Sequence, residues 1–266
     1  MLGKVFIICA FSLALHCCDV ENYLNFMQKH VQALGPFGSH KSGEIELSTN
    51  QDQIHAIQKT ASERLIKEGY SPAEAKNWTR VGIIAEDQYW IWVRDPVVFP
   101  SGHMGTYNRI LWRPSLDGPQ GVAILPVFQN DRFAVNLNYR HATRSWEIEV
   151  PRGARYPQED PEIAARRECL EETGLEIDTL TLLGEIAPDT GMTASVVPVY
   201  TGKVSTTKLS TPEDSEAIHK ILTLTRDELV SGLIRGYIDV SIHGKPIKAY
   251  CRDSFLAYAL LLSKKV

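Results

Sequence analysis

The stretch GARYPQEDPEIAARRECLEETGLE, residues 153–176, constrains this chain more than any other segment. Asp160 followed by Pro161 is typical of a helix N-cap and first turn, and Gly174 is typical of a helix end. The sequence therefore predicts a short helix over 161–173. Seven carboxylate side chains crowd this segment, although the formal net charge of the whole chain is only −4. They are Glu159, Asp160, Glu162, Glu168, Glu171, Glu172 and Glu176.

Three of these acids share one side of the predicted helix. Each helical residue advances by about 100°, so spacings of three and four place Glu168, Glu171 and Glu172 on one arc. Like charges on one arc repel each other, which leaves two interpretations. One is a solvated acidic face, and the other is a cluster that holds divalent cations, because Mg²⁺ prefers carboxylate oxygens, water and phosphate. We expect Ile163 and Leu170, on a different side, to pack the helix against the protein.

The segment resembles the sequence box of the Nudix hydrolases. Gly153 is followed after five residues by Glu159, after seven more by Arg167-Glu168-Cys169, and then by Glu171-Glu172 and Gly174-Leu175. Cys169 stands where that family usually has an aliphatic residue, and a cysteine serves there as a small hydrophobe. The resemblance implies a loop–helix–loop on an α/β/α sandwich that binds catalytic divalent metal, Mg²⁺ or Mn²⁺.

The same resemblance implies roles for individual residues. Glu168 and Glu172 would be the principal metal ligands, Glu171 would assist, and Gly153 would begin the metal-site loop, where a missing Cβ permits close backbone approach. Glu171 and Glu172 are thereby also candidate catalytic residues. An ion pair of Glu159 with Arg167 would brace the loop and the helix.

Segments around the box resemble the ADP-ribose pyrophosphatase branch of this family. They are VRDPVVFPSG, GVAILPVF, NYRHATRSWEIEVPRG and APDTGMTASVVPVY. In this branch Arg140 would contact phosphate, since a guanidinium fork suits two phosphate oxygens, with a surface ion pair as the alternative. Glu149 would lie near the metals. Arg152 would add a phosphate contact or form a salt bridge. Tyr139 and Trp146 would stack on an adenine or belong to the core.

A further catalytic carboxylate is expected in a loop after the box. The segment STPEDSEAI offers Glu213, Asp214 and Glu216, of which Glu216 matches the pattern best. One departure concerns a proline that the branch often has about 15 residues beyond the box. This chain has Thr190 there, which bears on the substrate rather than on the chemistry.

The resulting hypothesis is a pyrophosphatase that hydrolyses the diphosphate bond of ADP-ribose or a related nucleoside diphosphate sugar. The alternatives are a Nudix hydrolase for dinucleotides or other nucleotide derivatives, and a non-catalytic nucleotide-sensing domain. A sequence pI near 6.1 gives no reason to expect a nucleic-acid partner. Homodimers are common among the related pyrophosphatases, and a homodimer is possible here.

The patterning predicts an α+β chain in three parts. Residues 1–18 contain an apolar run too short to span a bilayer, which predicts a signal peptide, with an uncleaved anchor or a misassigned start as the alternatives. Residues 19–80 form a helical N-terminal extension, with helices near 50–68 and 71–78. Residues 81–266 form the Nudix domain, with a mixed sheet. A cleaved leader would make the protein secreted or periplasmic, and otherwise it would be cytoplasmic.

Strands and helices of this last part follow from β-branched, aromatic and alternating patterns. Strands are expected at 87–99, 121–128, 132–140, 145–150, 180–187, 196–204 and 217–225, and helices at 226–236 and 252–265.

Overall fold

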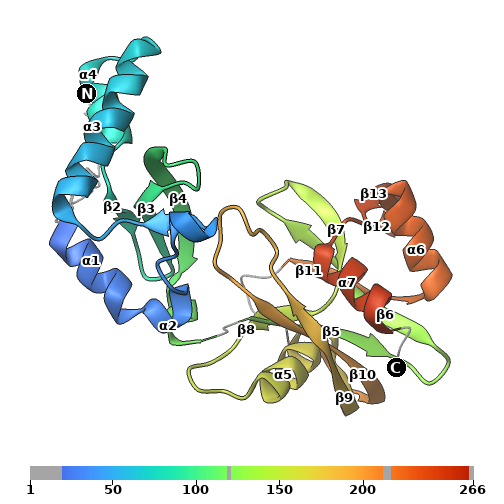
Figure 1. Cartoon of the computed structure of the whole chain (residues 1–266). Helices are drawn as coiled ribbons and strands as arrows, with labels where there is room; N and C mark the ends of the chain where they lie inside the picture. Colours follow the sequence, from blue (N-terminus) through green and yellow to red (C-terminus); the bar gives the residue numbers. More distant parts are fainter. Residues whose placement is uncertain (1–19, 119–120, 212–216, 264–266) are drawn as a thin grey trace, which may run out of the picture. The chain divides into compact units, whose positions relative to one another are not determined.

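The computed structural model describes residues 20–118, 121–211 and 217–263 (Figure 1). The predicted signal peptide therefore lies outside the described residues, and so does Glu216. The chain divides into two compact units. The first comprises the described residues up to Asp87 together with Ile91–Asn108, and the second comprises Gln88–Trp90 and the chain from Arg109 onward.

Helices dominate the beginning of the first unit, as predicted. They are α1 (Val20–Lys29), α2 (Val31–Leu34), the 3₁₀ turn η1 (His40–Ser42), α3 (Gln51–Lys67) and α4 (Pro72–Trp78). The Asn50 side chain caps α3 by accepting from the backbone N–H of Gln53. Ser71 and Glu74 form a reciprocal capping box at the start of α4. Both predicted helices are confirmed.

A four-stranded sheet completes this unit. Its strands are β1 (Glu46–Leu47), β2 (Gly82–Glu86), β3 (Trp90–Val98) and β4 (Met104–Trp112), with order β1-β3-β2 and with β4 also paired to β3. Most of this sheet groups with the N-terminal helices, which differs from the boundary that we predicted between residues 80 and 81. The alternating pattern of a strand does not say which sheet the strand joins, so the pattern could not place that boundary.

The second unit is built on a mixed sheet of nine strands. The order is β12-β13-β7-β6-β5-β10-β9, with β11 paired to β6 and β8 paired to β5. The strands are β5 (Gly121–Val127), β6 (Arg132–Arg140), β7 (Ser145–Glu149), β8 (Arg152–Ala154), β9 (Leu175–Ile186), β10 (Val197–Thr207), β11 (Ile218–Thr225), β12 (Tyr237–Ile242) and β13 (Lys245–Tyr250). β5 and β10 are parallel, and β13 also runs parallel to β7. The expected α+β class with a mixed sheet is confirmed.

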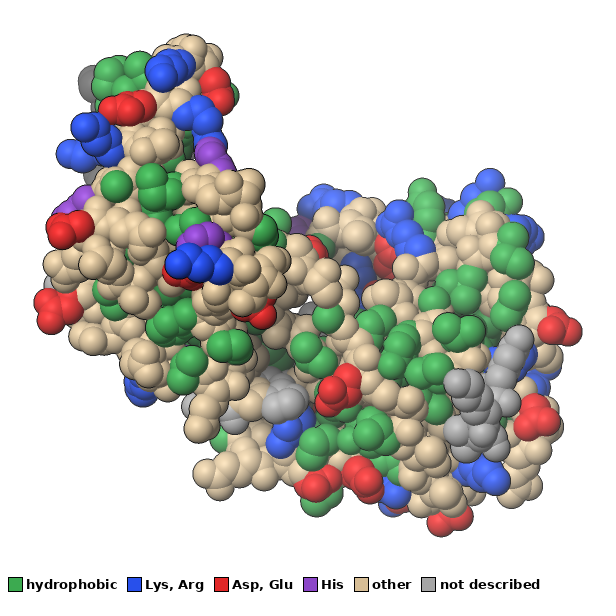
Figure 2. All heavy atoms as spheres, in the orientation of Figure 1, with side chains coloured by type: hydrophobic (Ala, Val, Ile, Leu, Met, Phe, Trp, Pro, Cys, Tyr) green, Lys and Arg blue, Asp and Glu red, His purple; other side chains and the backbone are tan. Residues whose placement is uncertain are grey.

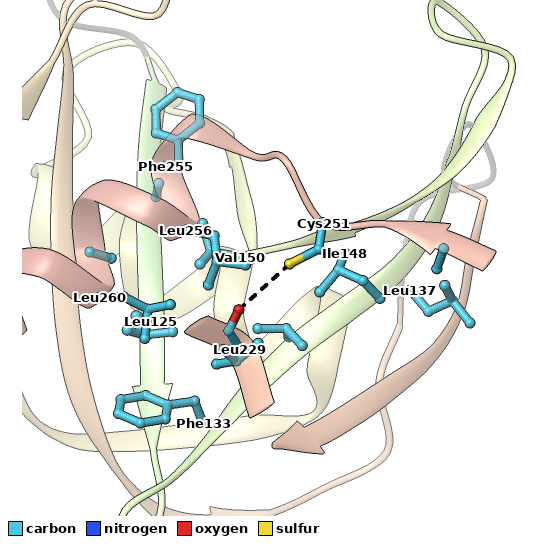
Figure 3. Close-up of a cluster of buried hydrophobic side chains, with 14 of the residues drawn as sticks. Leu125, Phe133, Leu137, Ile148, Val150, Leu229, Cys251, Phe255, Leu256 and Leu260 are labelled. Carbon is cyan, nitrogen blue, oxygen red and sulfur yellow. Dashed lines mark hydrogen bonds between the residues drawn. The ribbon is translucent and has the colours of Figure 1, made fainter. Parts of the chain in front are cut away.

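Three helices accompany this sheet, together with the 3₁₀ turn η2 (Arg113–Asp117). They are α5 (Pro161–Thr173), α6 (Arg226–Arg235) and α7 (Ser254–Leu262). Because strand side chains alternate between faces, β5 contributes Val122 and Ile124 to the core under α5. Its intervening residues Ala123 and Leu125 join the core that includes α6 and α7. Figure 3 shows Leu125 in this core. The sheet is thus covered on both faces, as in the predicted sandwich.

One packing prediction is wrong. Ile163 is 59% exposed rather than packed, and α5 instead buries Ala164, Ala165 and Cys169 against the sheet. Small side chains allow the helix to lie close to the strands, which the larger Ile163 would prevent. Burial also raises the pKa of the Cys169 thiol to about 12, so this cysteine is an inert core residue.

Charged side chains of both signs are interspersed on the face of the molecule shown in Figure 2. Within the described residues no helix is both long and apolar enough to cross a membrane.

The packing of α7 against the sheet leads to a prediction about the free energy of unfolding. Leu256 is 0% exposed, whereas Leu261 on the same helix is 67% exposed. We expect Leu256→Ala to lower the free energy of unfolding by roughly 2–5 kcal/mol, because the loss of methyl groups leaves a cavity. Urea unfolding of the two variants checks this expectation. Leu261→Ala is the control, and an equal effect of both substitutions would contradict the assigned core.

Candidate active site

Helix α5 begins and ends where its sequence predicts. The Asp160 side chain caps it by accepting from the backbone N–H of Glu162, and Pro161 occupies the first position. Gly174 ends it in a left-handed conformation with φ 72°, and its N–H donates to the Leu170 carbonyl at 2.8 Å. These caps fix the first and last residues of the helix.

The acidic arc is mostly buried rather than solvated. Glu168 is 8% exposed and Glu172 is 3% exposed, while the side chain of Glu171 is 31% exposed. Glu168 lies against Gly153 of β8, so closely that a Cβ at position 153 would overlap the Glu168 carboxylate. A side chain at position 153 would therefore force the Glu168 carboxylate to move.

Glu172 contacts the sheet directly. Its Oε2 accepts a hydrogen bond from Nδ2 of Asn136 on β6 at 2.6 Å and from the backbone N–H of Arg152 at 3.3 Å. Two donors from two strands thus support one carboxylate in a buried position.

Arg167 joins the acids of the box. Its guanidinium forms two bonds with Glu159, at 3.0 and 2.9 Å, and its Nη1 lies 2.8 Å from Glu168 and 2.9 Å from Glu171. A further bond at 2.8 Å reaches the Ala154 carbonyl. The expected ion pair of Glu159 with Arg167 is present. Hydrogen bonding from Arg167 lowers the pKa of Glu159 below its ordinary value.

A second ion-pair network lies on β6, β7 and β8. Glu149 is buried and accepts from Arg140 at 2.8 Å and from Arg152 at 3.0 Å. Arg152 also binds Asp253 at 2.5 Å, and its side chain is 22% exposed, whereas that of Arg140 is 40% exposed. Although burial opposes the charged form, Asp253 and Glu149 raise the pKa of Arg152. The salt-bridge interpretation of Arg152 is thus the one that the contacts favour.

Some predicted residues are not brought to this face. Tyr139 and Trp146 contact each other with ring centroids 5.4 Å apart, and Trp146 packs against the core that includes α6 and α7. They therefore lie on the opposite face of β6 and β7 from Glu149 and Asn136. Glu216 lies outside the described residues, and the residue after it, Ala217, accepts a hydrogen bond from the backbone of Tyr139.

Two residues of the networks were not predicted from the sequence. Asp253 caps α7, where its side chain accepts from the backbone N–H of Leu256, and its other contact with Arg152 is a tertiary one. Asn136 forms an Asn-x-Asn alternation with Asn138 on β6. The sequence did contain a signal for Asn136, because two polar residues on the same face of an otherwise apolar strand indicate a polar site.

The described side chains of this region offer oxygen donors to a hydrated divalent cation, but they form no complete cage around one. Among the residues that the structure describes, no three His, Cys, Asp or Glu side chains converge as a complete metal site. The buried Glu168 carboxylate nevertheless lies at the missing Cβ of Gly153, and the buried Oδ1 atoms of Asn136 and Asn138 find no hydrogen-bond partner in the described part of the chain. Hard oxygen donors of this kind are what Mg²⁺ and Mn²⁺ prefer.

Comparisons with known proteins agree with this arrangement. Residues 119–235 match the family model described as NUDIX domain. Over 135 residues the chain is 27% identical to a protein named methanol dehydrogenase activator from Bacillus methanolicus, which covers 50% of this chain and 70% of that protein. A solved structure described as an ADP compounds hydrolase has a TM-score of 0.52 and 18% identity, covering 70% of this chain and 90% of that chain.

The segment that matches the NUDIX domain model, residues 119–235, contains the whole box and the strands that support it. The second unit of the fold supplies this domain.

The contact of Gly153 with Glu168 can be tested by a double-mutant cycle. We expect Gly153→Ala to cost about 1–3 kcal/mol of unfolding free energy, because the added Cβ forces Glu168 away from Arg167. In a Glu168→Ala background the same change is expected to cost almost nothing, which thermal unfolding of the four proteins measures. Gly121→Ala is the control, since its Cβ would lie 3.4 Å from Val197 in ordinary contact. Equal costs in both backgrounds would refute the contact.

The Arg167–Glu159 pair predicts a pH dependence. The folded pKa of Glu159 is lowered, so the pair stabilises fully above the ordinary value of 4.5 and loses its effect as pH falls through the lower folded pKa. We expect the difference in Tm between the wild type and Arg167→Met to shrink between about pH 5 and pH 3. Arg166→Met is the control, because Arg166 donates to the Asp178 carbonyl at 3.1 Å. A Tm difference that is constant with pH would contradict this assignment.

Proposed function

We propose that this protein is a divalent-metal-dependent pyrophosphatase that hydrolyses the diphosphate bond of ADP-ribose or a related nucleoside diphosphate sugar. Water attacks one phosphorus, the bridging P–O bond breaks, and ADP-ribose yields AMP and a sugar phosphate. The observation that carries this proposal is the burial of Glu168 and Glu172 at the junction of α5 with β6 and β8. Two carboxylates buried in this way do not form the solvated acidic face that was the alternative interpretation.

Glu168 and Glu172 would hold the cation, with Glu171 assisting from the more exposed edge of the helix. When bound, Mg²⁺ or Mn²⁺ neutralises phosphate charge and acidifies a water molecule. Arg167 keeps the carboxylates of Glu168 and Glu171 close together before the ligand arrives, because its Nη1 lies within 3 Å of both. Repulsion among the acids is thereby offset in the free protein.

Arg140 and Arg152 would have different roles. Arg140 is the more exposed of the two, so its guanidinium can turn an edge toward a phosphate while Glu149 holds the other edge. Arg152 is engaged by Glu149 and Asp253, and it would orient Glu149 rather than bind substrate. Glu149 in turn would lie between the phosphate-binding arginine and the metal-binding acids.

The proposed substrate is supported by similarity to other proteins and not by the geometry of the site. The segments around the box resemble the ADP-ribose branch, and one similar solved structure is described as an ADP compounds hydrolase. Glu216 remains a proposed catalytic carboxylate of the loop before β11.

The test is release of AMP from ADP-ribose in the presence of Mg²⁺. We expect Glu172→Gln to lower kcat by about 100-fold or more, because a neutral amide can no longer hold the cation that supplies the electrostatic stabilisation. Chelation of the metal with EDTA is expected to abolish activity, and added Mg²⁺ is expected to restore it.

Glu162→Gln is the matched control, since Glu162 is an exposed glutamate on the first turn of the same helix. Undiminished hydrolysis by Glu172→Gln would exclude the proposed metal role. A wild-type protein that hydrolyses other nucleotide derivatives but not ADP-ribose would exclude the proposed substrate and leave the metal role intact.

A further inference from the structure

Two asparagines occupy the polar face of β6. Asn136 is 2% exposed and Asn138 is 4% exposed, and they are two residues apart, so their side chains leave the strand on the same face. Leu137 between them points into the opposite core. On the neighbouring strand β7, Asn136 is paired with Glu149, which is also buried. Both amides therefore lie in the acidic interior beside α5 rather than in solvent.

Each amide donates to one buried acid. Nδ2 of Asn136 lies 2.6 Å from Oε2 of Glu172, and Nδ2 of Asn138 lies 3.4 Å from Oε2 of Glu149. The Asn136 bond is short and is made to an acid that also accepts from the backbone of Arg152. An amide turned the other way would place two acceptors face to face, so the acids determine which end of each amide faces them.

This orientation has a cost at the other end of each amide. Oδ1 of Asn136 and Oδ1 of Asn138 are buried and find no hydrogen-bond partner among the described residues. A buried acceptor without a donor destabilises the folded protein, because it loses its hydrogen bonds to water. A valine at either position would suit a strand and would leave no unpaired amide oxygen. Two unpaired oxygen atoms beside the acids of the site indicate a ligand that carries hydrogen-bond donors.

We propose that Asn136 is a positioning residue for the metal site, and that Asn136 and Asn138 accept hydrogen bonds from the water molecules of a hydrated divalent cation. This inference rests on the proposed function, because the cation belongs to the proposed reaction. Mg²⁺ dehydrates reluctantly and keeps several waters when proteins bind it, and those waters are strong donors. The donor end of Asn136 fixes the Glu172 carboxylate, and the acceptor ends satisfy the hydration shell.

The two asparagines would differ in effect. Asn136 supports Glu172 on the metal-binding helix, whereas Asn138 supports Glu149, which is already held by Arg140 and Arg152. Groups that orient metal ligands typically change metal affinity or activity by about 10- to 100-fold when they are removed. We therefore expect the larger loss at Asn136 and a smaller one at Asn138.

The experiment measures Mn²⁺ binding to the full chain by electron paramagnetic resonance, without substrate. We expect Asn136→Leu to weaken Mn²⁺ binding by about 10- to 100-fold and Asn138→Leu to weaken it less. Asn136→Thr is a second variant, because its side chain suits a strand but is too short to make the bond to Glu172. Kinetics with ADP-ribose are expected to show a fall in kcat at saturating Mn²⁺ with little change in KM.

Thr201→Val is the control, since Thr201 is a buried polar residue of the same sheet whose hydroxyl donates to the Leu125 carbonyl. Its loss is expected to change Tm and leave Mn²⁺ binding unchanged. Folded Asn136 variants that bind Mn²⁺ as the wild type does would overturn the inference, and the two amides would then enclose only structural water. A wild type that binds Mn²⁺ but does not hydrolyse ADP-ribose would overturn the proposed substrate without affecting this inference. A wild type that does not bind Mn²⁺ would overturn both.

Discussion

Burial of charged carboxylates beside one helix is the constraint on which the second unit of this protein depends. Removing a carboxylate from water costs several kcal/mol unless donors and opposite charges replace the water. Arg167 supplies that replacement for Glu159, Glu168 and Glu171, and Asn136 with the Arg152 backbone supplies it for Glu172. The position of α5 over the sheet is therefore set by polar contacts as much as by its small apolar side chains.

The side chains of β6 alternate between an apolar core on one face of the sheet and the buried acids on the other face. Phe133, Val135 and Leu137 face the apolar core beneath α6 and α7, whereas Asn136, Asn138 and Arg140 face the acids. A one-residue shift of register would exchange these faces and bury an arginine in the apolar core. The pairing of β6 with β7 and β11 thus protects the site, because it holds the register from both sides.

Local sequence patterns were sufficient to predict the helices whose ends are capped by nearby side chains. The caps of α3, α4 and α5 are side-chain contacts within four residues, so the chain near each cap contains all the information needed. The hairpin of β12 and β13 was not predicted, although Ile238, Val240 and Ile242 alternate with polar residues and His243-Gly244 turns the hairpin. The packing side of α5 was wrongly assigned, because apolarity favoured Ile163 and Leu170 whereas close approach to the sheet required alanines.

The sequence alone determined the Nudix box, the helix that carries it and the spacing that groups its acids, because these depend on residues near one another in the chain. Only the tertiary structure decided which donors meet those acids. Asn136 lies 36 residues from Glu172, and Asp253 lies 101 residues from Arg152. Such contacts depend on strand order and register, which no local pattern specifies. For the same reason only the fold shows that Arg152 is more enclosed than Arg140.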